Sequence, residues 1–173
     1  MTQTKKLTVS AAVSALCAAF LSISSLLPNM SLSLSALAGL FPAVVVICCG
    51  SLWALGASAA AGALALLLLP EKTAAVWFCL FFGHYPVWKA LAERCKTPAI
   101  TWTFKLLGFL FCGAALYFIF RTAFLAVLPS FLTESDWMLP LTVGAFCVCF
   151  VLYDLAFSRL ISWFVKRILP HII

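Results

Sequence analysis

The chain has 173 residues, of which 65% are hydrophobic and only 9% are charged, and its mean hydropathy is +1.17. A soluble domain carries about 25% charged residues, so this composition excludes a soluble globular protein and indicates a surface that faces lipid. The net charge of +6 does not predict nucleic-acid binding, because the lysines and arginines flank apolar runs and form no basic patch.

Six apolar stretches predict an all-α integral membrane protein, a single domain built as a bundle of six transmembrane helices. A spanning helix needs about 20 apolar residues, and short loops with proline, glycine or charge separate the stretches. No clear internal repeat is evident in the sequence. The predicted helices cover residues 7–27, 36–49, 52–69, 73–90, 103–128 and 137–158.

The first of these helices is expected to remain part of the protein. Its apolar stretch is longer than the 7–15 residues of a usual signal-peptide core, so cleavage is not expected. Residues 31–35 alternate polar and apolar side chains, which predicts a strand-like segment or an interfacial loop. The uncharged residues 36–69 are too long for one span, so two helices joined by a tight turn at Gly50 and Ser51 are expected. Pro42 lies near the start of the first of them, where proline is tolerated or kinks the helix.

The charges in the loops predict how the bundle is oriented. Basic residues lie at the N-terminus, in region 89–105 and at the C-terminus, whereas loop 129–136 holds Glu134 and Asp136 and no base. Cytoplasmic loops carry an excess of lysine and arginine, so six spans with both termini inside satisfy the pattern. The expected location is the inner (plasma) membrane, as a multi-pass protein. A basic amphipathic tail, 159–173, is expected to lie on the inner membrane surface.

The motif content predicts neither an enzyme nor a metal protein. Seven of the eight cysteines fall within apolar runs, with no CxxC pair and no Cys/His cluster at zinc spacing, so they are interpreted as small apolar side chains. Hydrolase, metalloprotease and nucleotide-binding motifs are absent. No catalytic residue, metal ligand or cofactor is therefore assigned, and any energised transport would need a separate ATPase.

Placing an ionisable side chain within a membrane span costs free energy, so each such residue in the predicted spans requires a structural or functional explanation. At about 1.5 Å per helical residue, Lys89 and Asp154 lie at matched depths, which predicts an ion pair between the fourth and sixth helices. Lys105 and Arg159 are alternative partners for Asp154, and Lys89 can also extend its ammonium toward the interface. The four intramembrane ionisable residues are His84, Lys89, Arg121 and Asp154.

Arg121 is predicted near the outer end of the fifth helix. A guanidinium at this place can bind an anionic group through two hydrogen bonds. It can equally reach the outer headgroups, or pair with Glu134 or Asp136.

The segment from Gly83 to Lys89 combines glycine, proline and polar side chains within one span. Interrupted helices at membrane depth often line a cavity, so His84 and Tyr85 are candidates for a polar cavity. The alternative is that His84 is a hydrogen-bonded core residue.

A stripe of small side chains marks one face of the first helix. Ala11, Ala15 and Ala19 are four residues apart and share a face, which permits close approach of another helix. The stripe is expected to dock a partner and to be exposed in the isolated chain. The alternative is packing within the chain, as expected for the small residues 57–63.

These features together resemble the substrate-binding S components of energy-coupling factor (ECF) transporters. The resemblance rests on the basic start, the alanine stripe, the low-charge segment 28–35, the helix with Pro42 and the glycine-marked turn. It implies a small, vitamin-like substrate, a transmembrane coupling subunit that docks on the stripe, and partner ATPases. By position it implies a substrate site on the outer side formed by Asn29, Trp77, Arg121 and Trp137.

Two other functions are compatible with the sequence. A multi-pass structural or assembly factor without a ligand fits, because every polar residue has a plausible structural role. A small membrane enzyme that uses His84 is the third hypothesis.

Overall fold

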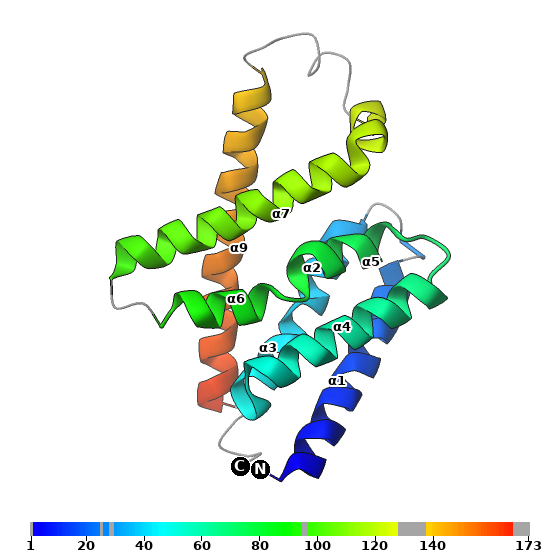
Figure 1. Ribbon diagram of the computed structural model, residues 1–173, viewed down its shortest axis with the longest axis vertical. Coiled ribbons are helices and arrows are strands. Elements are labelled where there is room, and N and C mark those ends of the chain that lie inside the picture. Colours follow the sequence, from blue (N-terminus) through cyan, green and yellow to red (C-terminus); the bar gives the residue numbers. More distant parts are fainter. Residues whose placement is uncertain (1, 25, 28–29, 95–96, 128–137, 168–173) are drawn as a thin grey trace. The chain divides into compact units, whose positions relative to one another are not determined.

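The computed structural model describes residues 2–24, 26–27, 30–94, 97–127 and 138–167 and, for side chains, these residues without 116–127 and 138–143. These residues form helices and turns with no strand, which confirms the predicted all-α class (Figure 1). The helices are α1 (Gln3–Ser24), α2 (Ser31–Ala38), α3 (Leu40–Cys49), α4 (Ser51–Leu68), α5 (Thr73–Trp77), the π-helix η2 (Phe78–Phe82), α6 (Tyr85–Ala92), α7 (Pro98–Val127) and α9 (Met138–Arg167).

Several of these helices are long and apolar enough to cross a membrane, which is consistent with a multi-pass membrane protein. The helical region 73–92 is divided by the π-helix and a turn, so it contains no single helix of spanning length. The count of six spans and the orientation with both termini inside stay predictions. Among the described residues the candidate spans are Gln3–Ser24, Ser31–Cys49, Ser51–Leu68, Pro98–Ala115 and Gly144–Arg167.

The orientation can be tested by cysteine labelling in intact cells. A Ser130→Cys probe is expected to react with a membrane-impermeant maleimide added outside, whereas native Cys95 is expected not to react. Both positions lie outside the described residues, so the expectation rests on the charge pattern alone. Labelling of Cys95 and protection of position 130 would reverse the topology.

The chain divides into two compact units, Met1–Gly108 and Phe109–Ile173. Unit 1 contains α1 to α6 and the first turns of α7. In unit 2 the rings of Phe109 and Phe150 stack with their centroids 4.5 Å apart, which joins the remainder of α7 to α9.

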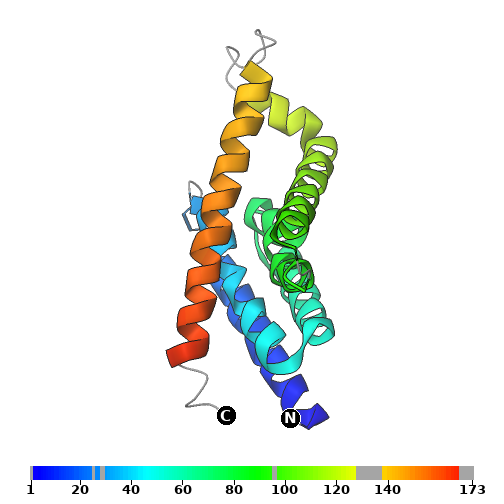
Figure 2. The ribbon, with the colours of Figure 1, turned by 90° about the vertical axis from the view of Figure 1, so that its left-hand side faces the viewer.

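The first residues of the tail predicted for 159–173 belong to helix α9, and the location of this tail on the inner membrane surface stays a prediction. Helix α9 continues without interruption to Arg167 (Figure 2), because no glycine or proline occurs between Gly144 and Pro170. Ser158 and Ser162 are compatible with this helix, because each hydroxyl donates a hydrogen bond to the carbonyl oxygen four residues earlier, at 2.7 and 2.9 Å. Residues 168–173 lie outside the described residues.

The alternating segment 31–35 is helical and not a strand or loop. Ser31 and Ser35 are both buried in α2, and they are four residues apart, so they share a helical face. The Ser35 hydroxyl lies 2.6 Å from the carbonyl oxygen of Ser31 and 2.9 Å from that of Ala74. Internal hydrogen bonding therefore makes a serine-rich helix acceptable in an apolar setting. Helix α7 also begins earlier than predicted, at Pro98, a position that suits the first turn of a helix.

The predicted turn at Gly50 is confirmed. Gly50 lies between α3 and α4 with φ of 101°, a backbone conformation that favours glycine. The polar turn before α5 is also present, and the Lys72 ammonium donates to the carbonyl oxygens of Leu66, at 2.6 Å, and Leu69.

Unit 1 contains an internal repeat that was not evident in the sequence. Module 1 (residues 3–49) and module 2 (residues 51–92) each consist of one continuous helix followed by one interrupted helix. The interruptions read Gly39-Leu40-Phe41-Pro42 and Gly83-His84-Tyr85-Pro86, and they are forty-four positions apart. All buried residues of α1 except Ser24 have a buried equivalent in α4 at the same offset: Ser10, Val13, Ser14, Cys17, Ala18 and Leu21 in α1, and Ala54, Ala57, Ser58, Ala61, Gly62 and Ala65 in α4.

The two modules pack side by side and run in the same direction. Helix α1 packs against α4, α2 lies beside α5 and η2, and α3 lies beside α6 (Figure 1). The two interruptions meet, because a Cβ atom on Gly39 would lie 2.7 Å from the backbone oxygen of Phe82. Since Gly39 has ordinary helical φ and ψ, the glycine is required for close approach and not for its backbone freedom.

Candidate functional site

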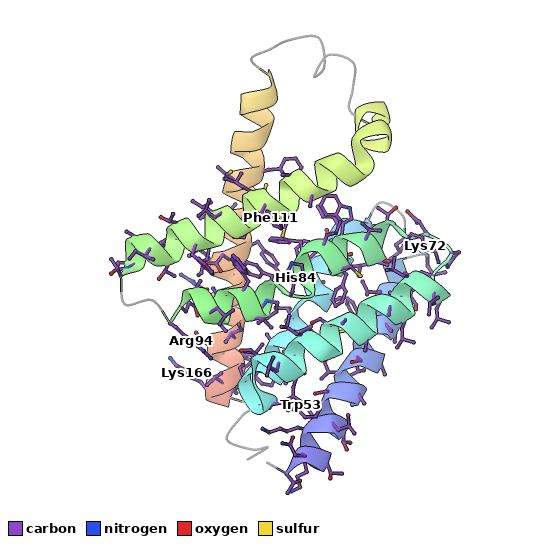
Figure 3. The ribbon with its side chains drawn as sticks, in the orientation of Figure 1. Trp53, Lys72, His84, Arg94, Phe111 and Lys166 are labelled. Atoms are coloured by element: carbon purple, nitrogen blue, oxygen red, sulfur yellow. The ribbon has the colours of Figure 1, made fainter. Side chains whose placement is uncertain are left out.

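The interrupted helix of module 2 is held by an unusual set of hydrogen bonds. The Gly83 amide donates to the carbonyl oxygen of Phe78 at 2.7 Å, five residues back, which forms the π-helix η2. The carbonyl of Cys79, which an α-helix would pair with Gly83, instead forms a hydrogen bond with the His84 side chain. His84 lies at the junction of η2 and α6 (Figure 3). The helix interruption predicted in this segment is present, and His84 has a structural part in it.

Within unit 1, serine hydroxyls donate hydrogen bonds to backbone carbonyl oxygens of neighbouring helices. Ser58 of α4 lies 2.6 Å from the carbonyl oxygen of Gly83, at the interruption itself. Ser14 of α1 lies 3.0 Å from that of Ala57. In lipid no water can satisfy a freed carbonyl, so Ser58 makes the broken helix tolerable. The Ser14 bond instead joins α1 to the continuous helix α4.

Ser58→Ala is expected to lower the free energy of unfolding by about 1 kcal/mol, because the Gly83 carbonyl loses its side-chain donor. Ser162→Ala is the control, since Ser162 is exposed and donates only to its own helix, and its effect should be near zero. The measurement is thermal or denaturant unfolding in detergent. Equal stability of the two variants would show that the Ser58 hydroxyl is dispensable.

Four side chains form a continuous line down one side of module 2, here termed the polar stripe: Phe81, Tyr85, Lys89 and Glu93. The rings of Phe81 and Tyr85 have centroids 5.3 Å apart, and the Lys89 ammonium lies 2.9 Å from the Glu93 carboxylate. Tyr85 and Lys89 are only 2% and 3% exposed, whereas the Glu93 side chain is 49% exposed. The stripe thus leads from the helix interruption, through a buried phenol and a buried cation, to a carboxylate near the surface.

The first turns of α7 contact the polar stripe at its Glu93 end. The buried Lys105 ammonium lies 3.2 Å from the same Glu93 oxygen and 5.3 Å from the centre of the Trp102 ring. The Trp88 ring stacks on Phe104 at 4.4 Å, and its indole nitrogen donates to the Phe104 carbonyl oxygen at 3.2 Å. One carboxylate therefore serves two buried lysines.

Glu93 was missed in the sequence analysis, although a signal was present. It follows Lys89 by four residues, a spacing that brings opposite charges together on a helix. The predicted partner of Lys89, Asp154, belongs to unit 2 and is 1% exposed. The Lys89–Asp154 pair stays a prediction.

The alanine stripe of α1 is exposed. Ala11, Ala15 and Ala19 lie on the side of α1 opposite the buried face that includes Ser14 and Cys17. The stripe is therefore not used for packing within unit 1, and the exposure that docking requires is present. Docking itself stays a prediction.

The structure describes only some of the residues that were predicted to form a substrate site on the outer side. Trp77 ends α5 and is half-buried. Arg121 lies within α7, but its side chain is outside the described set, and Asn29 and Trp137 lie outside the described residues. The described part of the chain contains no group of three or more histidine, cysteine, aspartate or glutamate side chains that could hold a metal ion.

Comparisons with known proteins give no relative for this chain. No protein-family model matches it, and neither a curated protein nor a solved structure is significantly similar.

Proposed function

We propose that this chain is the membrane-embedded, substrate-binding subunit of an ECF-type importer for a small, vitamin-like molecule. It would reside in the inner (plasma) membrane with both termini in the cytoplasm. The observation that carries the proposal is the exposed stripe of Ala11, Ala15 and Ala19 on α1.

The stripe favours a helical partner for a physical reason. Lipid chains are as apolar as helix surfaces, so helices associate in membranes mainly through close backbone approach and packing. An alanine side chain fills little space against acyl chains, but it lets the backbone of another helix come near. The partner that fits is a transmembrane coupling subunit, which would connect this chain to ATPases that it lacks itself.

Co-purification with the coupling subunit tests the docking proposal. Ala15→Trp is expected to leave the thermal unfolding temperature unchanged, because the site is exposed, and to abolish recovery of the partner. Ala59→Trp is the matched control, since Ala59 is the exposed equivalent in module 2, and it should retain the partner. Loss of stability in Ala15→Trp, or equal partner recovery from both variants, would contradict docking on this face.

A structural or assembly factor without a ligand is the second candidate. It is favoured by the structural use of the polar groups, such as the His84 hydrogen bond to Cys79 and the Lys89–Glu93 ion pair. On this hypothesis the purified protein carries no small molecule.

A further inference from the structure

The glycine amide at each interruption makes an equivalent backbone hydrogen bond in the two modules, but the two bonds enclose different numbers of residues. In module 1 the Gly39 amide donates to the carbonyl oxygen of Ser35, four residues back, at 3.0 Å. In module 2 the Gly83 amide donates to that of Phe78, five residues back, at 2.7 Å. An α-helix uses the first spacing and a π-helix the second. Module 2 therefore has one more residue between the bonded groups.

The offset between equivalent buried residues of the two modules changes across this bond. Up to Phe78 the modules match at forty-three positions, and from Phe82 onward they match at forty-four. The matching pairs are Ser31 with Ala74, Ser35 with Phe78, Ala38 with Phe82 and Pro42 with Pro86. Ala75 is an exception, since it is buried and its equivalent Leu32 is exposed. One residue inserted between Phe78 and Phe82 explains both offsets.

The extra residue frees one carbonyl, and His84 bonds to it. The carbonyl of Cys79 is not paired with the Gly83 amide and forms a hydrogen bond with the His84 side chain. In module 1 the position equivalent to His84 is Leu40, which has no side-chain donor, and the described residues of that module contain no π-helix. In lipid a freed carbonyl needs a partner within the protein. The histidine therefore makes the inserted residue tolerable.

A glycine of the neighbouring helix α4 leaves room for η2. A Cβ atom on Gly62 would lie 2.5 Å from the Cys79 sulfur. The equivalent of Gly62 in module 1 is Ala18, which is buried in α1. Module 2 thus has a smaller residue than module 1 at the place where its helix contains the π-turn.

We infer that η2 is a one-residue insertion held by His84, and that residues 78–84 form a conformational joint between α5 and α6. A π-helix is rare and often marks a functional site. Helix α5 packs against α2, and α6 packs against α3. The joint lets the half of module 2 that carries Trp77 move against α6 when His84 releases the Cys79 carbonyl. The inference goes beyond the proposed function and applies equally to a carrier and to an assembly factor.

Hydrogen–deuterium exchange of the purified, detergent-solubilised chain tests the joint. The equivalent segment of module 1, residues 35–40, is an internal reference in the same molecule. The amides of residues 78–84 are expected to exchange about fivefold faster or more, the factor that corresponds to one hydrogen bond. Equal exchange in the two segments would overturn the joint.

Deletion of Leu80 tests the insertion. It turns the bond between Gly83 and Phe78 into an ordinary α-helical bond and leaves α5 and α6 on their buried faces. The variant is expected to keep or raise the unfolding temperature, and residues 78–84 should then exchange as slowly as the segment in module 1. Deletion of Ala60 is the control, because it rotates the following buried residues of α4 by about 100° and should strongly destabilise the protein. Equal damage from the two deletions would overturn the insertion.

A double-mutant cycle tests the part of His84. His84→Leu copies module 1 and should lower the unfolding temperature of the full chain, because the Cys79 carbonyl loses its side-chain donor. In the chain without Leu80, the His84 backbone amide lies four residues from Cys79 and can donate to its carbonyl. The same change should then have little effect. An equal loss in both backgrounds would show that His84 acts independently of the insertion.

Discussion

Asp154→Asn is expected to lower the free energy of unfolding by up to about 3–5 kcal/mol, the range for removing one partner of a buried ion pair. Asp154 is 1% exposed, and it lies in the middle of the apolar helix α9. Asparagine keeps the shape of the side chain and removes its charge, so the loss would report a buried base that has lost one carboxylate. If Lys89 is that base, it keeps Glu93 at 2.9 Å, which places the loss toward the lower end of this range. Denaturant unfolding in detergent measures the effect.

A double-mutant cycle identifies the base. If Lys89 is the partner, Lys89→Met combined with Asp154→Asn should recover much of the stability that Asp154→Asn loses alone. Lys105→Met and Arg159→Met serve as matched controls, because they remove the two alternative partners. The cost of depriving Glu93 of Lys89 should be small, since its half-exposed carboxylate is hydrated and retains Lys105. Additive effects of the Lys89 and Asp154 changes would refute the pair.

Gly39→Ala is expected to destabilise the protein by about 1–3 kcal/mol, the usual cost of overpacking a close contact. The added Cβ would lie 2.7 Å from the backbone oxygen of Phe82 and 3.1 Å from its Cβ. These atoms belong to the backbone region of the interrupted helix, so they cannot move aside as a flexible side chain would. The two modules must separate where their interruptions meet.

Gly56→Ala is the control for Gly39→Ala. A Cβ on Gly56 has no neighbour within 4 Å, and alanine is a better helix former than glycine by about 1 kcal/mol, so this variant should be neutral or more stable. Comparison of the two midpoints in thermal unfolding separates crowding from helix propensity. A Gly39→Ala protein as stable as Gly56→Ala would show that the interruptions do not meet as described.

Composition and loop chemistry predicted the main features of the fold. The deficit of charge predicted apolar helices, and Gly50 predicted the sharp turn that its φ of 101° confirms. The combination of Gly83 and Pro86 predicted an interrupted helix, which α6 shows by beginning anew at Tyr85. These signals are local, so the sequence alone is sufficient to detect them.

The features that sequence analysis missed depend on partners distant in the chain. Ser31 and Ser35 resembled a strand pattern, because nothing local showed that the Ser35 hydroxyl also reaches the Ala74 carbonyl. The repeat was missed because equivalent positions of the two modules share burial and small side chains more often than the same residue type, as at Cys17 and Ala61. The shared use of Glu93 by Lys89 and Lys105 required the start of α7 to be placed beside α6.

Native mass spectrometry of the purified wild-type chain tests the proposed binding function most directly. The proposal predicts a complex heavier than the chain by the mass of one small molecule, which is released on activation and identified by its accurate mass. A chain that retains lipid adducts under the same conditions, yet shows no small molecule, would contradict the substrate-binding account.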